Sequence, residues 1–283
     1  MQSKPSERLE SFAAARLRLG DVAGIVRVRE RTGAAMQIRI TGSKPRVERI
    51  ECEPRGDVLV ISDPACVGGD TFARRGAVRT RAQVFGPGVS FGTVGSHVHI
   101  ADAEVVVSSS HGSHVVSAHG DVVHVDHHDG DLEIVVDVPP QTPITIEAAS
   151  GRYRVDDVKG SLDVRLTGVA DVRAGSVGPS QIDLGGTSRA EILAVSGREL
   201  RARIAAAGQL TVREGEVDTL IVTVADAGKA VFGGVTARAD LSVTGTGKIR
   251  VNQVTESLVD RQEGLGRISV HVPPRRDPGS FWR

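Results

Sequence analysis

Apolar and polar residues alternate along most of this chain, which is the pattern of β-strands that bury one face. In the first part of the chain, apolar runs with a period of two occupy residues 15–19, 25–28, 36–40 and 58–61. Gly and polar residues separate these runs and supply turns. The alternation therefore predicts an all-β protein.

From residue 142 to residue 273 the alternation repeats about every 19 residues. Aligning the repeats on one small residue gives the anchors Gly151, Ala170, Ala190, Gly208, Gly228, Gly247 and Gly266. Apolar residues follow the anchors at the second and fourth positions, and others precede most anchors at the eighth, sixth and fourth. A fixed repeat with persistent columns is typical of stacked rungs. We predict a parallel β-solenoid (β-helix) with rungs of about 19 residues, and an antiparallel meander is the alternative.

A polar residue directly follows every anchor, so this column should face water. Its members are Arg152, Asp171, Glu191, Gln209, Lys229, Lys248 and Arg267. Their signs are mixed, without the paired acids that a glycoside-cleaving enzyme needs, so we interpret the column as a solvated face. In the last repeat Leu258 is followed by Asp260 and Gln262, where earlier repeats are apolar. These residues predict a polar cap that protects the end of the stack.

The pattern predicts four segments along the chain. Residues 1–10 are a flexible N-terminus, and residues 11–130 are a strand-rich N-terminal part with Gly-rich and His-rich segments. Residues 131–273 hold the solenoid repeats, and residues 274–283 are a flexible tail. The strand-rich part is expected to continue directly into the solenoid.

Composition and charge narrow the classes of function. Lys plus Arg equals Asp plus Glu at 35 each, and no long basic stripe with aromatics is evident, so we expect no nucleic-acid partner. Aromatic residues are few, so Val, Ile, Leu and Ala must fill the core. The sequence contains no apolar stretch of about 18 residues, so we expect no transmembrane segment. The first 20 residues lack the apolar core of a signal peptide, which leaves a cytosolic protein or a mature exported form.

The repeated unit Val-Thr-Gly-Thr-Gly-Lys-Ile-Arg-Val at residues 243–251 is echoed at residues 224–232. It resembles the G-x-G-[DK]-[VI]-x-[VL] repeat of the bacterial auto-transporter adhesin family with a head GIN domain, and of related adhesin-like β-repeat proteins. The run from Ser11 to Ile61 is similar to the opening of that family. The resemblance implies a β-helical protein of the periplasm or cell surface without catalytic residues. Its partner would be a cell-surface protein or a carbohydrate.

Histidines are the one chemical peculiarity, since eight of the nine lie between His97 and His128. The motifs around His97 and His114 are 17 residues apart, close to one rung, and His99 shares a strand face with His97. Such imidazoles could bind Zn, Ni or Cu. The simpler interpretation is a solvated strand face. We therefore predict no metal, no cofactor and no catalytic residues, and keep His97, His99 and His114 as the metal candidates.

Two further motifs and the cysteines suggest chemistry that the context does not support. Residues 88–92 read Gly-Val-Ser-Phe-Gly, but the nucleophile elbow of a hydrolase needs a helix after its serine, and strand patterning follows here. Residues 55–57 read Arg-Gly-Asp, which we interpret as a turn with Gly56 at positive φ. Cys52 and Cys66 could form a disulfide after export or stay as two structural thiols.

The sequence thus favours a non-catalytic, adhesin-like binding or structural module of the bacterial cell envelope. A self-assembling β-helical scaffold, which would be a homo-oligomer, is the first alternative. A carbohydrate-active enzyme on a β-helix is the second, and it would need paired carboxylates on one face.

Overall fold

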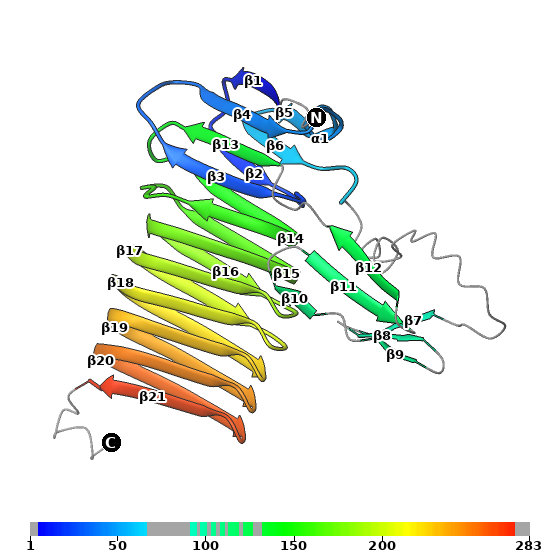
Figure 1. The fold of residues 1–283 in the computed structure, drawn as a ribbon. Helices are drawn as coiled ribbons and strands as arrows, with labels where there is room; N and C mark the ends of the chain where they lie inside the picture. The colour runs from blue at the N-terminus through cyan, green and yellow to red at the C-terminus, as the bar shows by residue number, and fades with distance from the viewer. Residues whose placement is uncertain are drawn as a thin grey trace, which may run out of the picture.

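The protein is a parallel β-solenoid of about seven turns, with rungs about 19 residues apart (Figure 1). This computed structural model describes residues 5–66 and 132–274 in full and, between them, the backbone of six short strands. The predicted all-β class and parallel solenoid are confirmed. Residues 275–283, most of the predicted flexible tail, lie outside the described residues.

The C-terminal stack consists of strands that pair in parallel with their neighbours along the chain. They are β14 (Ile144–Val155), β15 (Leu162–Val177), β16 (Ser180–Leu184), β17 (Arg189–Ile204), β18 (Gln209–Asp226), β19 (Lys229–Gly245), β20 (Lys248–Gly264) and β21 (Arg267–Val272). Equivalent residues lie opposite each other, as Leu210 does to Ala230 and Ala230 to Ile249. These inward side chains are buried and form aliphatic ladders through the core.

Each complete rung presents two outward faces, because the chain runs along one side of the stack, bends at a corner and returns along the other. We call the first side the anchor face, since it follows the anchors. Its segments are residues 25–28, 152–155, 171–174, 189–192, 209–212, 229–232, 248–251 and 267–270. The second side is the opposite face. Its segments are residues 17–20, 144–148, 162–166, 180–184, 200–204, 220–224, 239–243 and 258–262.

One predicted anchor is wrong by two residues. Val172 lies opposite Ala190, and Ala190 lies opposite Leu210, so the anchor of that rung is Ser188 rather than Ala190. Ser188 is completely buried, and its hydroxyl donates a hydrogen bond to the carbonyl oxygen of Gly185 at 2.5 Å. A buried serine whose hydroxyl is hydrogen-bonded to the backbone can occupy a position that otherwise takes Gly or Ala.

The N-terminal strands continue the solenoid, as predicted. They are β1 (Ser6–Phe12), β2 (Arg16–Leu19), β3 (Ile25–Glu30), β4 (Met36–Gly42), β5 (Glu51–Arg55), β6 (Val58–Ser62) and β13 (Glu133–Val138). Strands β2 and β3 pair in parallel with β14, while β6 pairs with β2 and β13 with β3. The rung of β6 and β13 therefore precedes the rung of β2 and β3 in space, although β13 comes later in the sequence.

An antiparallel cap closes this end of the stack. Strand β4 runs antiparallel to β13 and β5 runs antiparallel to β6, with the short helix α1 (Lys44–Arg49) between them. Strand β1 pairs with β4 and includes residues 6–10, which the sequence had assigned to a flexible N-terminus. The guanidinium of Arg8 donates to the carbonyl oxygen of Ile50 at 2.8 Å, so β1 is tied to the end of α1.

We call the part of the sequence between β6 and β13 the insertion, and the structure describes six short strands of it. Its strands are β7 (Phe91–Val94), β8 (His97–Ile100), β9 (Ala103–Val105), β10 (Ser108–Ser110), β11 (Ser113–Ala118) and β12 (Asp121–Asp126). They pair in two separate antiparallel sheets, β7–β8–β9 and β10–β11–β12.

The far end of the stack has the predicted polar residues. Asp260 lies opposite Leu241 and Gln262 lies opposite Val243, and both polar side chains are exposed. Among the residues that the structure describes, no helix is long and apolar enough to cross a membrane.

Candidate functional site

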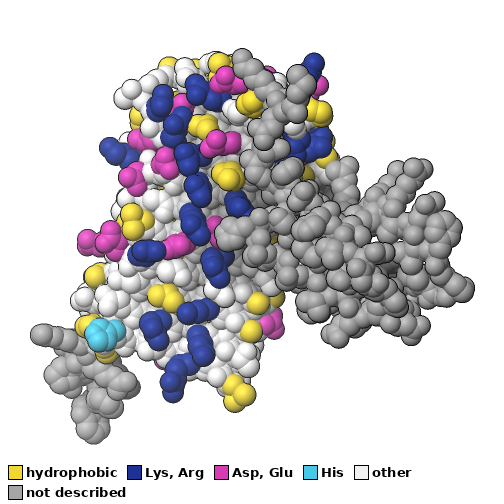
Figure 2. All heavy atoms as spheres, in the orientation of Figure 1, with side chains coloured by type: hydrophobic (Ala, Val, Ile, Leu, Met, Phe, Trp, Pro, Cys, Tyr) yellow, Lys and Arg dark blue, Asp and Glu magenta, His cyan; other side chains and the backbone are white. Residues whose placement is uncertain are grey.

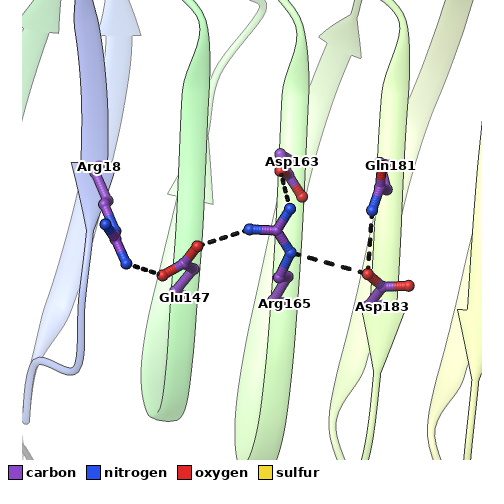
Figure 3. Close-up of polar contacts among 6 residues, drawn as sticks. All are labelled: Arg18, Glu147, Asp163, Arg165, Gln181 and Asp183. Carbon is purple, nitrogen blue, oxygen red and sulfur yellow. Dashed lines mark hydrogen bonds and ion pairs between the residues drawn. The ribbon is translucent and has the colours of Figure 1, made fainter. Parts of the chain in front are cut away.

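The opposite face carries a network of ion pairs that crosses four adjacent strands (Figure 3). Glu147 on β14 accepts hydrogen bonds from Arg18 on β2 and from Arg165 on β15, the latter at 2.7 Å. Arg165 also contacts Asp163 at 2.7 Å and Asp183 on β16 at 3.9 Å. Arg18, Glu147, Asp163 and Arg165 border a shallow hollow of about 430 Å³.

Paired acids, which the sequence did not reveal, thus occur on this face. Glu147, Asp163 and Asp183 come from successive rungs, and all three contact Arg165. Burial raises the pKa of Asp163, while Arg165 lowers it and the two neighbouring carboxylates raise it. An acid–base pair needs carboxyl groups that can face a substrate. Here one guanidinium engages all three, so the cluster is suited to cross-linking strands.

Further along the same face the charges are also paired. Arg201 contacts Glu199 at 2.8 Å, and Arg261 contacts Asp240 at 2.7 Å. Arg203 is exposed, and no acidic side chain in the described part of the chain pairs with it. The opposite face is therefore largely neutralised by its own ion pairs.

The anchor face has a different charge pattern once the register is corrected. The column after the anchors is Arg152, Asp171, Arg189, Gln209, Lys229, Lys248 and Arg267. A second outward column, two residues further on, is Arg27, Arg154, Arg173, Glu191, Thr211, Val231, Arg250 and Ser269. Figure 2 shows Lys and Arg side chains gathered in a stripe that runs along the stack.

Acidic neighbours neutralise only a small part of this stripe. Asp171 contacts Arg173 at 3.4 Å, and Glu191 pairs with Arg213. The hydrogen bond from Arg213 lowers the pKa of Glu191, and the nearby Arg173 and Arg189 lower it further. No acidic side chain within residues 5–66 and 132–274 pairs with the other cations of the two columns. These are Arg27, Arg152, Arg154, Arg189, Lys229, Lys248, Arg250 and Arg267.

Like charges even lie directly opposite each other on neighbouring strands. Arg154 on β14 is in register with Arg27 on β3 and with Arg173 on β15. Lys248 on β20 is in register with Lys229 on β19 and with Arg267 on β21. Facing like charges lower the stability of a sheet. Like charges in register are thus better explained by a ligand than by the fold, and we take the anchor face as the candidate functional site.

Comparison with known proteins agrees with this fold. The family model described as "Putative auto-transporter adhesin, head GIN domain" matches residues 101–273, which is more than half of the chain. The chain belongs to this family. The comparison with curated proteins gives no match.

Solved structures with a similar fold include two adhesin-like proteins and one further protein. A putative adhesin from Bacteroides fragilis NCTC 9343 is 13% identical, with a TM-score of 0.56, and the match covers 95% of this chain and 98% of that one. A putative adhesin from Parabacteroides distasonis ATCC 8503 is 14% identical, with a TM-score of 0.54 and coverage of 94% and 97%. A putative lipid binding protein from the same strain is 13% identical, with a TM-score of 0.51 and coverage of 94% and 96%. At these identities the likeness shows the fold alone.

The histidine candidates lie in the insertion of this family member. His97 and His99 are on β8 and His114 is on β11, which belong to different sheets. Their side chains lie outside the described residues, so the metal question stays a prediction. Within the described residues, no group of three or more His, Cys, Asp or Glu side chains could hold a metal ion.

The described strands beside the two short motifs agree with the expectation from the sequence. Ser90 itself lies outside the described residues, but strand β7 follows it where a nucleophile elbow would have a helix. The Arg-Gly-Asp segment ends β5 and turns into β6, with Gly56 at φ 64°. The positive φ at Gly56 confirms the predicted turn.

Cys52 and Cys66 are free thiols. Burial and, to a lesser extent, the nearby Glu10 raise the pKa of Cys52 to about 12, although Arg8 acts to lower it. Burial and Asp63 likewise raise the pKa of Cys66. Both thiols are therefore protonated and weakly nucleophilic at neutral pH.

This protonation predicts slow alkylation of Cys52 in the folded protein. At about pH 9, iodoacetamide should modify Cys52 at least about a hundredfold more slowly in the native protein than in urea, because the unfolded thiol has a pKa near its ordinary 9.0. Raising the pH should speed the native reaction by forming thiolate. Mass spectrometry of quenched samples measures both rates, and equal rates would contradict the buried, protonated state.

Proposed function

We propose that this family member is a non-catalytic, adhesin-like binding module of the bacterial cell envelope, and that the anchor face is its binding surface. The observation that carries the proposal is the contrast between the two faces. The opposite face pairs its charges, as Glu147 does with Arg165, whereas the anchor face presents Arg152, Arg154 and Lys248 without acidic partners in the described chain.

The shape of the surface supports binding rather than catalysis. The anchor face is the outer side of a sheet, so its side chains project in parallel columns at intervals of about 4.8 Å between rungs. Such a surface can make many similar contacts with an extended partner. Membership of an adhesin family supports the same role and a periplasmic or cell-surface location.

Binding of the labelled protein to intact bacterial cells tests the proposal. We expect saturable binding that falls by about tenfold in the variant Arg152→Gln/Arg154→Gln, because two unpaired charges of the surface are removed. The variant Arg203→Gln is the matched control, since it removes one unpaired arginine from the opposite face. Flow cytometry measures the bound fraction. Failure of the wild-type protein to bind any cells or isolated envelopes would contradict the proposal.

A self-assembling scaffold is the second candidate, and the end of the stack favours it. Within the described residues no strand pairs with the outer edge of β21, and the nearby Leu265 and Val272 are 88% and 42% exposed. An open edge of this kind can recruit another chain. Light scattering separates the two candidates. A binding module should keep one molar mass at all concentrations, whereas the molar mass of a scaffold should rise with concentration. The variant Val272→Lys should abolish that rise.

A further inference from the structure

We propose that the anchor face binds a linear acidic polysaccharide that lies along the stack, with its carboxylate or sulfate groups held by the cationic columns. This inference rests on the proposed binding function and adds the class of ligand. Its basis is the cationic stripe, defined here as the unpaired cations of the two outward columns of the anchor face.

The stripe has the form of an extended binding surface. Arg27 and Arg154 lie in register on adjacent strands, and Lys229, Lys248 and Arg267 do so further along. Gln209 and Thr211 form a neutral rung between these two groups. A partner that contacts both groups must follow the stack across several rungs, each about 4.8 Å from the next.

Acidic residues border the stripe on one side. Asp156, Asp157, Glu214 and Glu216 are exposed and follow the anchor-face segments at the corner where the chain turns. Figure 2 shows Asp and Glu side chains at the margin of the face, beside the Lys and Arg stripe. Their charge repels an anion that extends across the corner. A polyanion is thereby confined to the direction of the stack.

This geometry favours an acidic polysaccharide over other polyanions. Tyr153 and Phe232, the aromatic residues of the anchor-face segments, are buried, so the face lacks the stacking platforms of single-stranded nucleic-acid binders. A flat sheet face also offers nothing to enter the grooves of double-stranded DNA. An anionic membrane is a plane and would meet the acidic corner as well as the stripe. A chain of charged sugars fits a narrow stripe and needs no aromatic contact.

The facing like charges give the proposal a distinctive signature. If the Arg154 side chain stabilised the folded protein, its replacement would lower the melting temperature. Because Arg154 faces Arg27 and Arg173, removing its charge should leave the melting temperature unchanged or raise it while weakening binding. A loss of binding without a loss of stability therefore separates a ligand contact from a structural role.

Calorimetric titration with polygalacturonate and with heparin tests the inference, with dextran as the uncharged control. We expect both acidic polymers to bind at low ionic strength and to bind more weakly as salt is raised, because salt screens exposed charges. The variants Arg152→Gln/Arg154→Gln and Lys248→Gln/Arg250→Gln should each raise Kd by about tenfold or more. Arg203→Gln, the control on the opposite face, should bind like the wild type.

Several results would overturn the inference. These are wild-type affinity in both double variants, tighter binding to double-stranded DNA than to the acidic polymers, or tighter binding to phosphatidylglycerol vesicles than to those polymers. Binding to cells without binding to either acidic polymer would overturn the polysaccharide ligand and leave the proposed binding function intact. Absence of binding to cells and to both polymers would contradict the proposed binding function as well as the polysaccharide ligand.

Discussion

Replacing Gly233 with alanine is expected to lower the free energy of unfolding by about 3 kcal/mol, because the added methyl group meets a neighbouring rung. A Cβ at this position would lie 2.0 Å from the carbonyl oxygen of Arg213. That oxygen belongs to the backbone of β18 and cannot swing aside as a side chain could. Relief requires β18 and β19 to separate locally, although they share most of their length as a parallel ladder.

Gly33→Ala is the matched control for this prediction. The nearest atom to a Cβ at Gly33 is the carbonyl oxygen of Ala35 at 4.0 Å, so the methyl group has room. Loss of chain freedom in the unfolded state should leave stability unchanged or raise it by about 0.5 kcal/mol. Urea unfolding followed by circular dichroism measures both variants. Similar midpoints for the two would show that the rungs do not pack as closely at Gly233 as described.

The core of the solenoid could be predicted from the sequence because its pattern is local and repeated. Inward residues such as Leu210, Ala230 and Ile249 keep their place relative to the anchor in each rung. A constant repeat with persistent columns leaves few folds other than a parallel stack. The period and the buried columns could therefore be predicted without any knowledge of contacts between distant residues.

The register of one rung could not be predicted from the sequence in the same way. Small residues mark the anchors, and Ala190 fits that criterion better than Ser188 does. The hydrogen bond from Ser188 to Gly185 makes a buried serine acceptable, but the bond is visible only in three dimensions. The slip placed Glu191 in the column after the anchors, where Arg189 belongs. It thereby concealed the positive charge of the anchor face.

Long-range pairing explains what else the sequence did not reveal. The rung of β6 and β13 brings together strands that the insertion separates in the chain, and no local pattern signals this. The ion pair between Arg18 and Glu147 likewise joins residues from distant parts of the sequence. The cap helix α1 is only six residues long, too short to give a helical period.

Asp63→Ala is expected to destabilise the capped end of the solenoid by about 3 kcal/mol, because it removes the acceptor of a largely buried charge pair. The Asp63 side chain is completely buried, and its carboxylate accepts hydrogen bonds from Arg49 at 2.7 and 2.6 Å. It also accepts one from the backbone N–H of Ala65 at 2.9 Å. Alanine would leave the guanidinium of Arg49, at the end of α1, without this acceptor next to the end of β6.

The exposed pair of Glu53 and Arg55 supplies the control for this experiment, since their contact is also short at 2.7 Å. Solvent screens that pair, so Glu53→Gln should cost less than about 1 kcal/mol. Asp63→Asn should lie between the two, because the amide keeps one acceptor oxygen while losing the charge. Chemical denaturation of the three variants gives the order directly. Equal stability of Asp63→Ala and Glu53→Gln would show that the Arg49 contact does not hold the cap to the stack.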